Sequence, residues 1–187
     1  GDGGFILTKN KLTNDKVKRL RFYGIETSNK SNKYNNKYYA NEFGINSRID
    51  EIQSGILNYK LNNIDSYIKR RREIAKMYIN ELKGLNGIVL PEEYKNNFHV
   101  YHLFTVFHKE AKKIILQLKK KDIQTRTIYP YPINKMIAFK KYKFDNKEFP
   151  ISNFLAKSIF CLPLYPEIKN YEILKISRTL KKIIINL

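Results

Sequence analysis

The segment EFGINSRIDE at residues 42–51 places three polar side chains of different chemistry next to one another: the amide of Asn46, the hydroxyl of Ser47 and the guanidinium of Arg48. An apolar pattern with helical spacing begins directly after them, so we expect them at a helix N-terminus. Unpaired N–H groups and a partial positive charge favour a bound anion there. An amide can donate to phosphate, and a guanidinium can bind it through two hydrogen bonds. The alternative is that Ser47 caps the helix and Arg48 pairs with an acid.

A second stretch whose side chains could bind a ligand is TRTIYPYPIN at residues 125–134. Each proline fixes its own backbone and biases the residue before it, so the segment is predicted to be a stiff turn after a strand. That turn would present Tyr129 and Tyr131 at a strand end, where their hydroxyls and rings can contact a sugar or a nucleotide. The alternative is a proline-rich turn that serves packing alone.

The sequence shows no other catalytic or metal-binding pattern. His99 and His102 flank a predicted strand at an odd spacing, so their side chains face opposite sides and form no compact metal pair. The single cysteine, Cys161, lies in the apolar run SIFCLPL and is predicted to be a buried hydrophobic residue rather than a nucleophile. One cysteine excludes an internal disulfide, which favours a reducing cytoplasm.

Short elements precede the turn at Asn46. Residues 4–8 are predicted as a buried strand. Residues 14–24 are predicted as a helix that Thr13 or Asn14 caps. Residues 25–44 are polar and unpatterned, which indicates a surface loop.

A single long helix is predicted over residues 48–83, because apolar residues recur there at three- and four-residue steps. Ser47 followed by Asp50 is a capping-box-like start, and glycines follow the end of the pattern. The basic run KRRRE at residues 69–73 is predicted to face solvent, with nucleic-acid contact as the alternative. A helix of this length is a natural spine between two domains.

Strands and helices alternate downstream of this helix, which indicates an α+β domain. The predicted elements are a strand at 99–107, a helix at 110–122, a strand at 123–129, a helix at 152–162, an extended stretch at 162–168 and a helix at 170–184.

The composition narrows the class of protein. Of the 187 residues 42% are hydrophobic, including 14 Tyr and 11 Phe, which is enough for a core and argues against wholesale disorder. No apolar run is long enough to predict a membrane span. A net charge of +19 suggests nucleic acid, but the lysines are spread along the chain without stacking aromatics between them. An anionic small substrate explains the same charge more simply.

Six motifs resemble the DegT/StrS family of sugar aminotransferases, and their order along the chain is that of the family. Members are pyridoxal 5'-phosphate (PLP) enzymes of fold type I that act on nucleotide-linked keto-sugars. The resemblance implies an α/β fold in which residues 1–47 end the large PLP-binding domain, residues 48–83 form the long connecting helix and residues 84–187 form a small C-terminal α+β domain. The motifs are GDGGFILT, KVKRLRFYG, FGINSRIDEIQSGIL, HVYHLF, IQTRTIYPYPIN and LAKSIFCLPLYPEI.

The resemblance also assigns roles to the candidate residues. It implies that Asn46 reaches across a homodimer interface to the phosphate of the partner's PLP. It implies that Arg48 meets the pyrophosphate of a nucleotide sugar and that Tyr129, with Tyr131 beside it, lines the substrate pocket. Asn134 is also predicted to bind substrate, although many relatives have histidine at this position, which leaves the identity of the sugar open.

The implied reaction is transfer of an amino group, with glutamate as the expected donor, to a nucleoside-diphosphate-linked keto-sugar. Such products enter lipopolysaccharide, capsule or glycan synthesis, and no metal, membrane or nucleic acid is expected to take part. The Schiff-base lysine is expected just before Gly1, so the chain resembles the C-terminal half of such an enzyme and no catalytic residue is assigned within it. The alternatives are an inactive remnant acting as a folded or dimerisation module, a PLP-dependent sugar dehydratase and a basic nucleic-acid binder.

Overall fold

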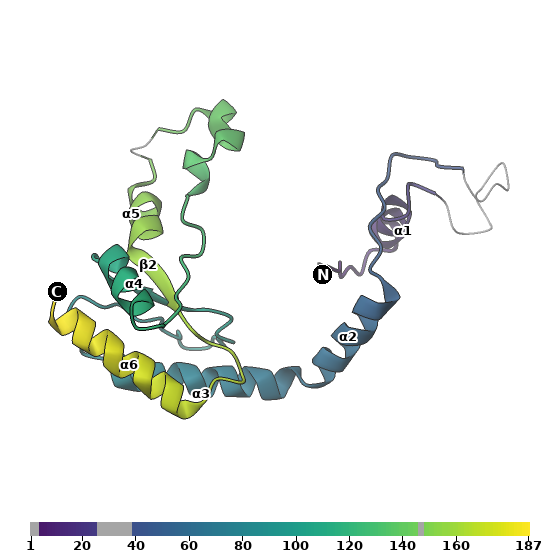
Figure 1. The fold of residues 1–187 in the computed structure, drawn as a ribbon. Coiled ribbons are helices and arrows are strands. Elements are labelled where there is room, and N and C mark those ends of the chain that lie inside the picture. The colour runs from purple at the N-terminus through teal and green to yellow at the C-terminus, as the bar shows by residue number, and fades with distance from the viewer. Residues whose placement is uncertain (1–3, 26–38, 146–147) are drawn as a thin grey trace. The chain divides into compact units, whose positions relative to one another are not determined.

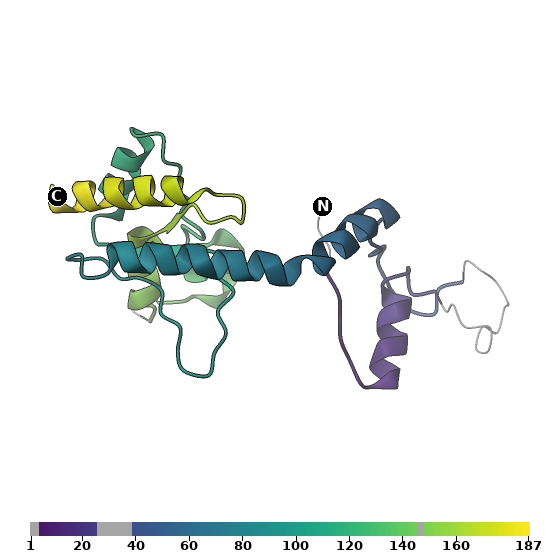
Figure 2. The same ribbon diagram turned by 90° about the horizontal axis from the view of Figure 1, so that it is seen from below.

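The computed structural model describes residues 4–25, 39–145 and 148–187, and Figures 1 and 2 show the elements. The chain divides into two compact units, an N-terminal unit of residues 1–63 and a C-terminal unit of residues 64–187.

The N-terminal unit begins with α1, Lys11–Leu20. The side chain of Asn10 caps this helix by accepting a hydrogen bond of 3.0 Å from the backbone N–H of Thr13, so the helix starts earlier than the predicted cap at Thr13 or Asn14. The predicted strand at 4–8 is wrong. Phe5 and Leu7 are more than four-fifths exposed, and no strand within the described residues pairs with this stretch.

The predicted helix over 48–83 is two helices, α2 (Glu51–Asn62) and α3 (Ile64–Leu82). The break falls at Asn63, whose side-chain amide donates to the carbonyl oxygen of Tyr59 at 2.9 Å. Such a local bond competes with the backbone pattern of the helix and explains why an asparagine interrupts it. The capping box is also wrong, because Asp50 is the N-cap residue and makes no side-chain capping bond.

The C-terminal unit is built on the antiparallel pair β1 (Phe104–Phe107) and β2 (Ile159–Leu162). Single bridges extend the pair on both sides, from Val89 to β1 and from Arg126 to β2. The other elements are α4 (Ala111–Lys119), the 3₁₀ helices η1 (Ile133–Lys135) and η2 (Ile137–Tyr142), α5 (Pro150–Ser158) and α6 (Asn170–Ile185).

The core of this unit lies between one face of the strand pair and the helices. Helices α3 and α6 pack side by side, as both ribbon views show, and α4 packs on α6. The hydroxyl of the buried Tyr78 donates to the carbonyl oxygen of Pro163 at 2.9 Å, and burial raises the pKa of this phenol. The fully buried large side chains are Tyr78, Phe104, Phe160, Ile74, Leu82, Ile114, Leu118, Ile173 and Leu180.

Tertiary contacts shorten two of the predicted elements. Of the strand expected at 99–107 only the last four residues form β1, because backbone carbonyls of residues 99–102 accept hydrogen bonds from arginine side chains of α3. The helix expected at 152–162 ends at Ser158, and the IFCL run that follows pairs with β1 as β2. The helices expected at 110–122 and 170–184 are confirmed as α4 and α6.

The basic run on α3 does not face solvent as predicted. Arg70, Arg71 and Arg72 are half-buried and bind backbone carbonyls of two loops that are distant in sequence. Arg72 donates to the carboxylate of Glu93 at 2.8 Å and lies over the ring of Phe98, 4.3 Å from its centroid. These arginines therefore fasten loops to α3.

In the part of the chain that the structure describes, no helix is both long and apolar enough to cross a membrane.

Candidate functional site

The segment that carries Asn46 is fixed by backbone pairing. Hydrogen bonds of 2.8–3.1 Å join residues 45–47 to residues 20–23, and Phe22 and Asn46 form an antiparallel bridge. Gly44 permits this close approach, since an added Cβ there would lie 2.1 Å from the backbone nitrogen of Gly24. The turn is therefore held by its backbone, which leaves the Asn46 side chain available.

Asn46 and Arg48 form a pair at the surface. The Nε of Arg48 donates to Oδ1 of Asn46 at 3.0 Å, and the guanidinium carbon lies 5.0 Å from the ring centroid of Phe22. Since the amide oxygen accepts this bond, the amide N–H groups of Asn46 are left to donate elsewhere. Among the described residues Arg48 has no acidic partner, so the predicted alternative of an ion pair is not found.

The pair lies before the helix rather than on its first turn. Helix α2 begins at Glu51 with Asp50 as its N-cap residue, so an acidic side chain already lies at the helix N-terminus. Ser47 donates its backbone N–H to the carbonyl oxygen of Arg21 at 3.0 Å and is not the cap. An anion in this turn would thus be held by the side chains of Asn46 and Arg48 more than by the helix itself.

The two tyrosines of the proline-rich turn are exposed, Tyr129 to 80% and Tyr131 to 69%. Tyr129 has φ of 56°, which is uncommon for a bulky residue and costs of the order of 1 kcal/mol. Their hydroxyls have no partner within the described residues. The turn therefore presents two phenols to solvent.

Asn134 behaves differently from the tyrosines. It lies in η1, is half-buried, and donates through Nδ2 to Oδ1 of Asn153 at 3.3 Å. Asn153 belongs to α5, so this contact fastens the turn to a helix. Asn134 is thus placed to position the turn, and its direct contact with substrate remains a prediction.

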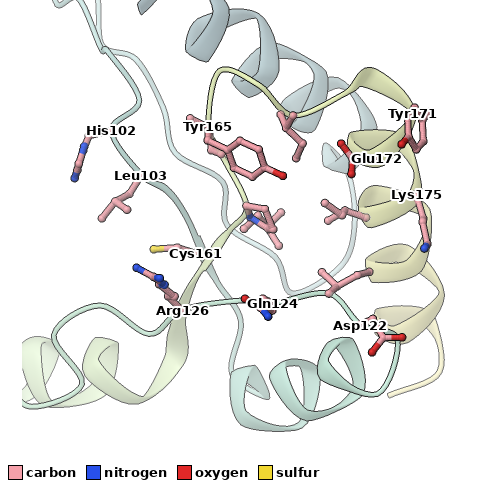
Figure 3. Close-up of a pocket in the computed structure, with 16 residues that line it drawn as sticks. His102, Leu103, Asp122, Gln124, Arg126, Cys161, Tyr165, Tyr171, Glu172 and Lys175 are labelled. Atoms are coloured by element: carbon pink, nitrogen blue, oxygen red, sulfur yellow. The ribbon is translucent and has the colours of Figure 1, made fainter. Parts of the chain in front are cut away.

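A cavity of about 670 Å³ lies in the C-terminal unit, and Figure 3 shows its lining side chains. The walls come from the start of α6, from the chain around β2 and from residues 122–126. Arg126 and Gln124 line it, and sequence reasoning did not select them. Their spacing of two residues places both on one face of an extended segment, which is the pattern that would have revealed them.

Two further residues of types that can act as nucleophiles or metal ligands, Cys161 and His108, have structural roles. Cys161 is buried as predicted, with its sulfur 3.4 Å from the hydroxyl oxygen of Thr105. His108 is also buried, its Nδ1 accepts from the backbone N–H of Glu110 at 3.0 Å, and burial lowers the pKa of its imidazole. Residues 4–25, 39–145 and 148–187 contain no group of three or more His, Cys, Asp or Glu side chains that could hold a metal ion.

Residues 1–181 match the family model described as the DegT/DnrJ/EryC1/StrS aminotransferase family. The chain belongs to this family. The motifs quoted above, with the NSRIDE turn among them, all fall inside the matched range.

Two curated relatives are each 35% identical to the chain. They are the dTDP-3-amino-3,4,6-trideoxy-alpha-D-glucose transaminase of Micromonospora megalomicea subsp. nigra and the dTDP-3-amino-3,6-dideoxy-alpha-D-galactopyranose transaminase of Aneurinibacillus thermoaerophilus. The matches cover 90% and 91% of this chain but 44% of each relative. The crystal structure of S. venezuelae DesV superposes with a TM-score of 0.86 at 28% identity, over 95% of this chain and 46% of that chain. The chain thus spans about half the length of the relatives it matches.

The candidate residues of this family member fall into two groups. Asn46 and Arg48 lie together in the N-terminal unit. Tyr129, Tyr131 and Asn134 lie on one turn of the C-terminal unit. The structure thus brings the members of each group together within its own unit.

Proposed function

We propose that the protein is a PLP-dependent aminotransferase, of which this chain is the C-terminal part. It transfers an amino group from glutamate to a keto-sugar carried on a nucleoside diphosphate, and the amino-sugar enters surface-polysaccharide or glycan synthesis in the cytoplasm. Membership of the aminotransferase family and the transaminase activity named for the two curated relatives support this function.

The observation that carries the proposal is the pair formed by Asn46 and Arg48. Because Arg48 Nε donates to Oδ1 of Asn46, the amide N–H groups are oriented away from Arg48 and can donate to a phosphate oxygen. The N–H groups of Arg48 other than Nε can bind a second anion through a planar fork. The donor set therefore fits a phosphate of PLP beside the pyrophosphate of a nucleotide sugar.

When bound, PLP supplies the electron sink on which amino transfer depends. The residues of this chain contribute binding and orientation. Asn46 holds the cofactor phosphate of the partner subunit in a homodimer, and Arg48 holds the nucleotide pyrophosphate. Tyr129 and Tyr131 contact the sugar through their hydroxyls, and Asn134 with Asn153 keeps the tyrosine turn in place.

We further propose the domain assignment implied by the resemblance, with residues 1–47 ending the large PLP domain, residues 48–83 connecting and residues 84–187 forming the small domain. The N-terminal unit carries exposed apolar side chains, which supports the proposal that a further part of the protein packs on them. Phe43 is fully exposed, and Leu7 and Ile52 are at least 80% exposed. Contiguous exposed apolar surface usually marks an interface, and these side chains are candidates for one.

The first test is intact mass after PLP is added to the protein and reduced with borohydride. A pyridoxyl adduct on a species heavier than the 22.3 kDa chain supports the aminotransferase. An unmodified 22.3 kDa chain supports the alternative, an inactive remnant that serves as a folded or dimerisation module. Product analysis with a nucleotide-linked keto-sugar separates a transaminase from a dehydratase, since only the transaminase adds nitrogen.

The second test addresses Asn46 in the adduct-forming protein. Asn46→Ala is expected to weaken PLP binding by about tenfold, because one charge-assisted hydrogen bond is lost. Asn41→Ala is the matched control. Asn41 is exposed, and it bonds to the carbonyl oxygen of Gly24 through its backbone N–H, which alanine keeps. Equal PLP affinity in the two variants would remove Asn46 from the cofactor site.

A further inference from the structure

The cavity of the C-terminal unit has one positively charged end. Figure 3 shows His102, Leu103 and Arg126 at this end, next to the sulfur of Cys161. The side chains of Asp122 and Lys175 lie at the other end. A ligand in the cavity would therefore meet a cationic end and an end of mixed charge.

Arg126 is firmly positioned at the cationic end. Its backbone N–H donates to the carbonyl oxygen of Cys161 at 3.3 Å, and its carbonyl oxygen accepts from the N–H of Cys161 at 2.7 Å. Directly paired residues share a face of a sheet, so the Arg126 side chain leaves from the face that carries Cys161 and Thr105. That face is opposite to the one on which Phe104 packs into the core.

The guanidinium of Arg126 is not neutralised within the protein. Among the residues that the structure describes, no acid pairs with Arg126. The two carboxylates of the cavity are placed elsewhere: Asp122 lies at the opposite end, and Oε2 of Glu172 accepts the backbone N–H of Lys169 at 2.8 Å. The guanidinium of Arg126 offers parallel N–H donors at a cavity end where the described residues place no acidic side chain. This arrangement suits a planar carboxylate, which can accept two hydrogen bonds at once.

We propose that Arg126 binds the carboxylate of the amino-acid donor. This inference rests on the proposed function, because it assigns a residue to the amino donor of that reaction. Arg126 lies three residues before Tyr129, so the segment that presents the sugar-binding tyrosines also carries the donor-binding arginine. The carboxylates of Asp122 and Glu172 in the same cavity favour a ligand that also carries a positive group, as the ammonium of an amino acid does, over a nucleoside diphosphate, which carries negative charge alone.

The test is titration of the 187-residue chain with L-glutamate, followed by NMR or calorimetry, since every residue of the cavity lies in this chain. Arg126→Gln is expected to weaken binding by ten- to a hundredfold, and Arg126→Lys by less, because lysine keeps the charge and loses the fork. Arg178→Gln removes an exposed arginine of the same unit that does not line the cavity and is expected to bind as the parent chain does. Circular dichroism checks that each variant is folded.

Three results would overturn the inference. They are a folded chain that does not bind glutamate, equal weakening in Arg126→Gln and Arg178→Gln, and inorganic phosphate binding that matches glutamate, which would make the cavity a general anion site. Glutarate, which has both carboxylates of glutamate but no amino group, shows which group is recognised. Binding equal to that of glutamate supports recognition through carboxylate alone.

The outcome is separable from that of the proposed function. Glutamate binding that depends on Arg126, together with no pyridoxyl adduct on any species heavier than the 22.3 kDa chain, retains this site and removes the aminotransferase. An active transaminase in which Arg126→Gln leaves the KM for glutamate unchanged retains the function and removes this site.

Discussion

Replacing Arg71 with alanine tests whether the arginines of α3 hold the C-terminal unit together. Its Nη1 lies 3.3, 3.2 and 3.3 Å from the carbonyl oxygens of Tyr101, His102 and Leu164. Two N–H bonds can serve at most two of the three oxygens well at one time. The side chain therefore contributes about two long charge-assisted hydrogen bonds between α3 and two separate loops.

The expected cost follows from those two bonds. A hydrogen bond to a charged group contributes roughly 1.5–3 kcal/mol at good geometry. The long distances and the half-exposed position reduce this, so we expect Arg71→Ala to lower the free energy of unfolding by about 2 kcal/mol. For a unit of this size the melting temperature should fall by about 8 °C.

The assay is thermal and urea unfolding followed by far-ultraviolet circular dichroism, which reports on α3 and α6. Lys69→Ala is the control, because Lys69 is exposed on the same helix, and its effect should stay within about 0.5 kcal/mol. Arg71→Lys should lose about half of the stability lost by Arg71→Ala, since lysine keeps the charge but its ammonium lies one bond closer to the backbone than Nη1 of Arg71. A melting temperature for Arg71→Ala equal to that of Lys69→Ala would refute this account of α3.

Three further predictions concern single groups. Burial raises the pKa of Tyr78, so the stability that its protonated form contributes is present below about pH 10 and falls as the pH rises further. Tyr78→Phe should remove that alkaline slope and cost about 1–2 kcal/mol for the lost hydrogen bond, as measured by urea unfolding at pH 7 and pH 11. The hydrogen bond from Arg72 lowers the pKa of Glu93, so its stabilisation is present above about pH 4.5 and is lost as the pH falls through the folded pKa; Glu93→Gln should flatten the acid limb of the melting profile. Gly24→Ala should open the N-terminal unit to limited proteolysis, since the backbone there has φ of 74° and an added Cβ would meet a carbonyl oxygen, whereas Gly55→Ala in α2 meets nothing and should protect it slightly.

Elements with a strong local pattern could be predicted from sequence. Helix α6 shows apolar spacing over sixteen residues and has Glu172 in its first turn, which accepts a backbone N–H at the helix start. Helix α4 has the same kind of pattern: Ile114 and Leu118, which are one helical turn apart, are both buried. In these cases the residues that decide the element lie within it.

Elements decided by distant residues, or by a single side chain within an otherwise continuous pattern, could not be predicted. The break at Asn63 depends on a side-chain bond that competes with the helix, within a pattern that is otherwise continuous. The strand before Phe104 is lost to arginines about thirty residues earlier. Of the candidate site, Asn46 and Arg48 were selected from sequence and contact each other in the structure, while their binding roles stay predictions. The cavity with Arg126 requires the pairing to Cys161, which is 35 positions away in the sequence.

The positions of arginine in this chain indicate which basic residues of its homologues are expected to have a specific role. Lysine is the default cation here, since only eight of the 36 basic residues are arginine. Five of those eight side chains bind an acid, an amide, a carbonyl or a ring. In this lysine-rich chain, therefore, the few arginines mark positions where a flat group with several donors is required, and the same positions in a homologue are the first basic residues to test for a role.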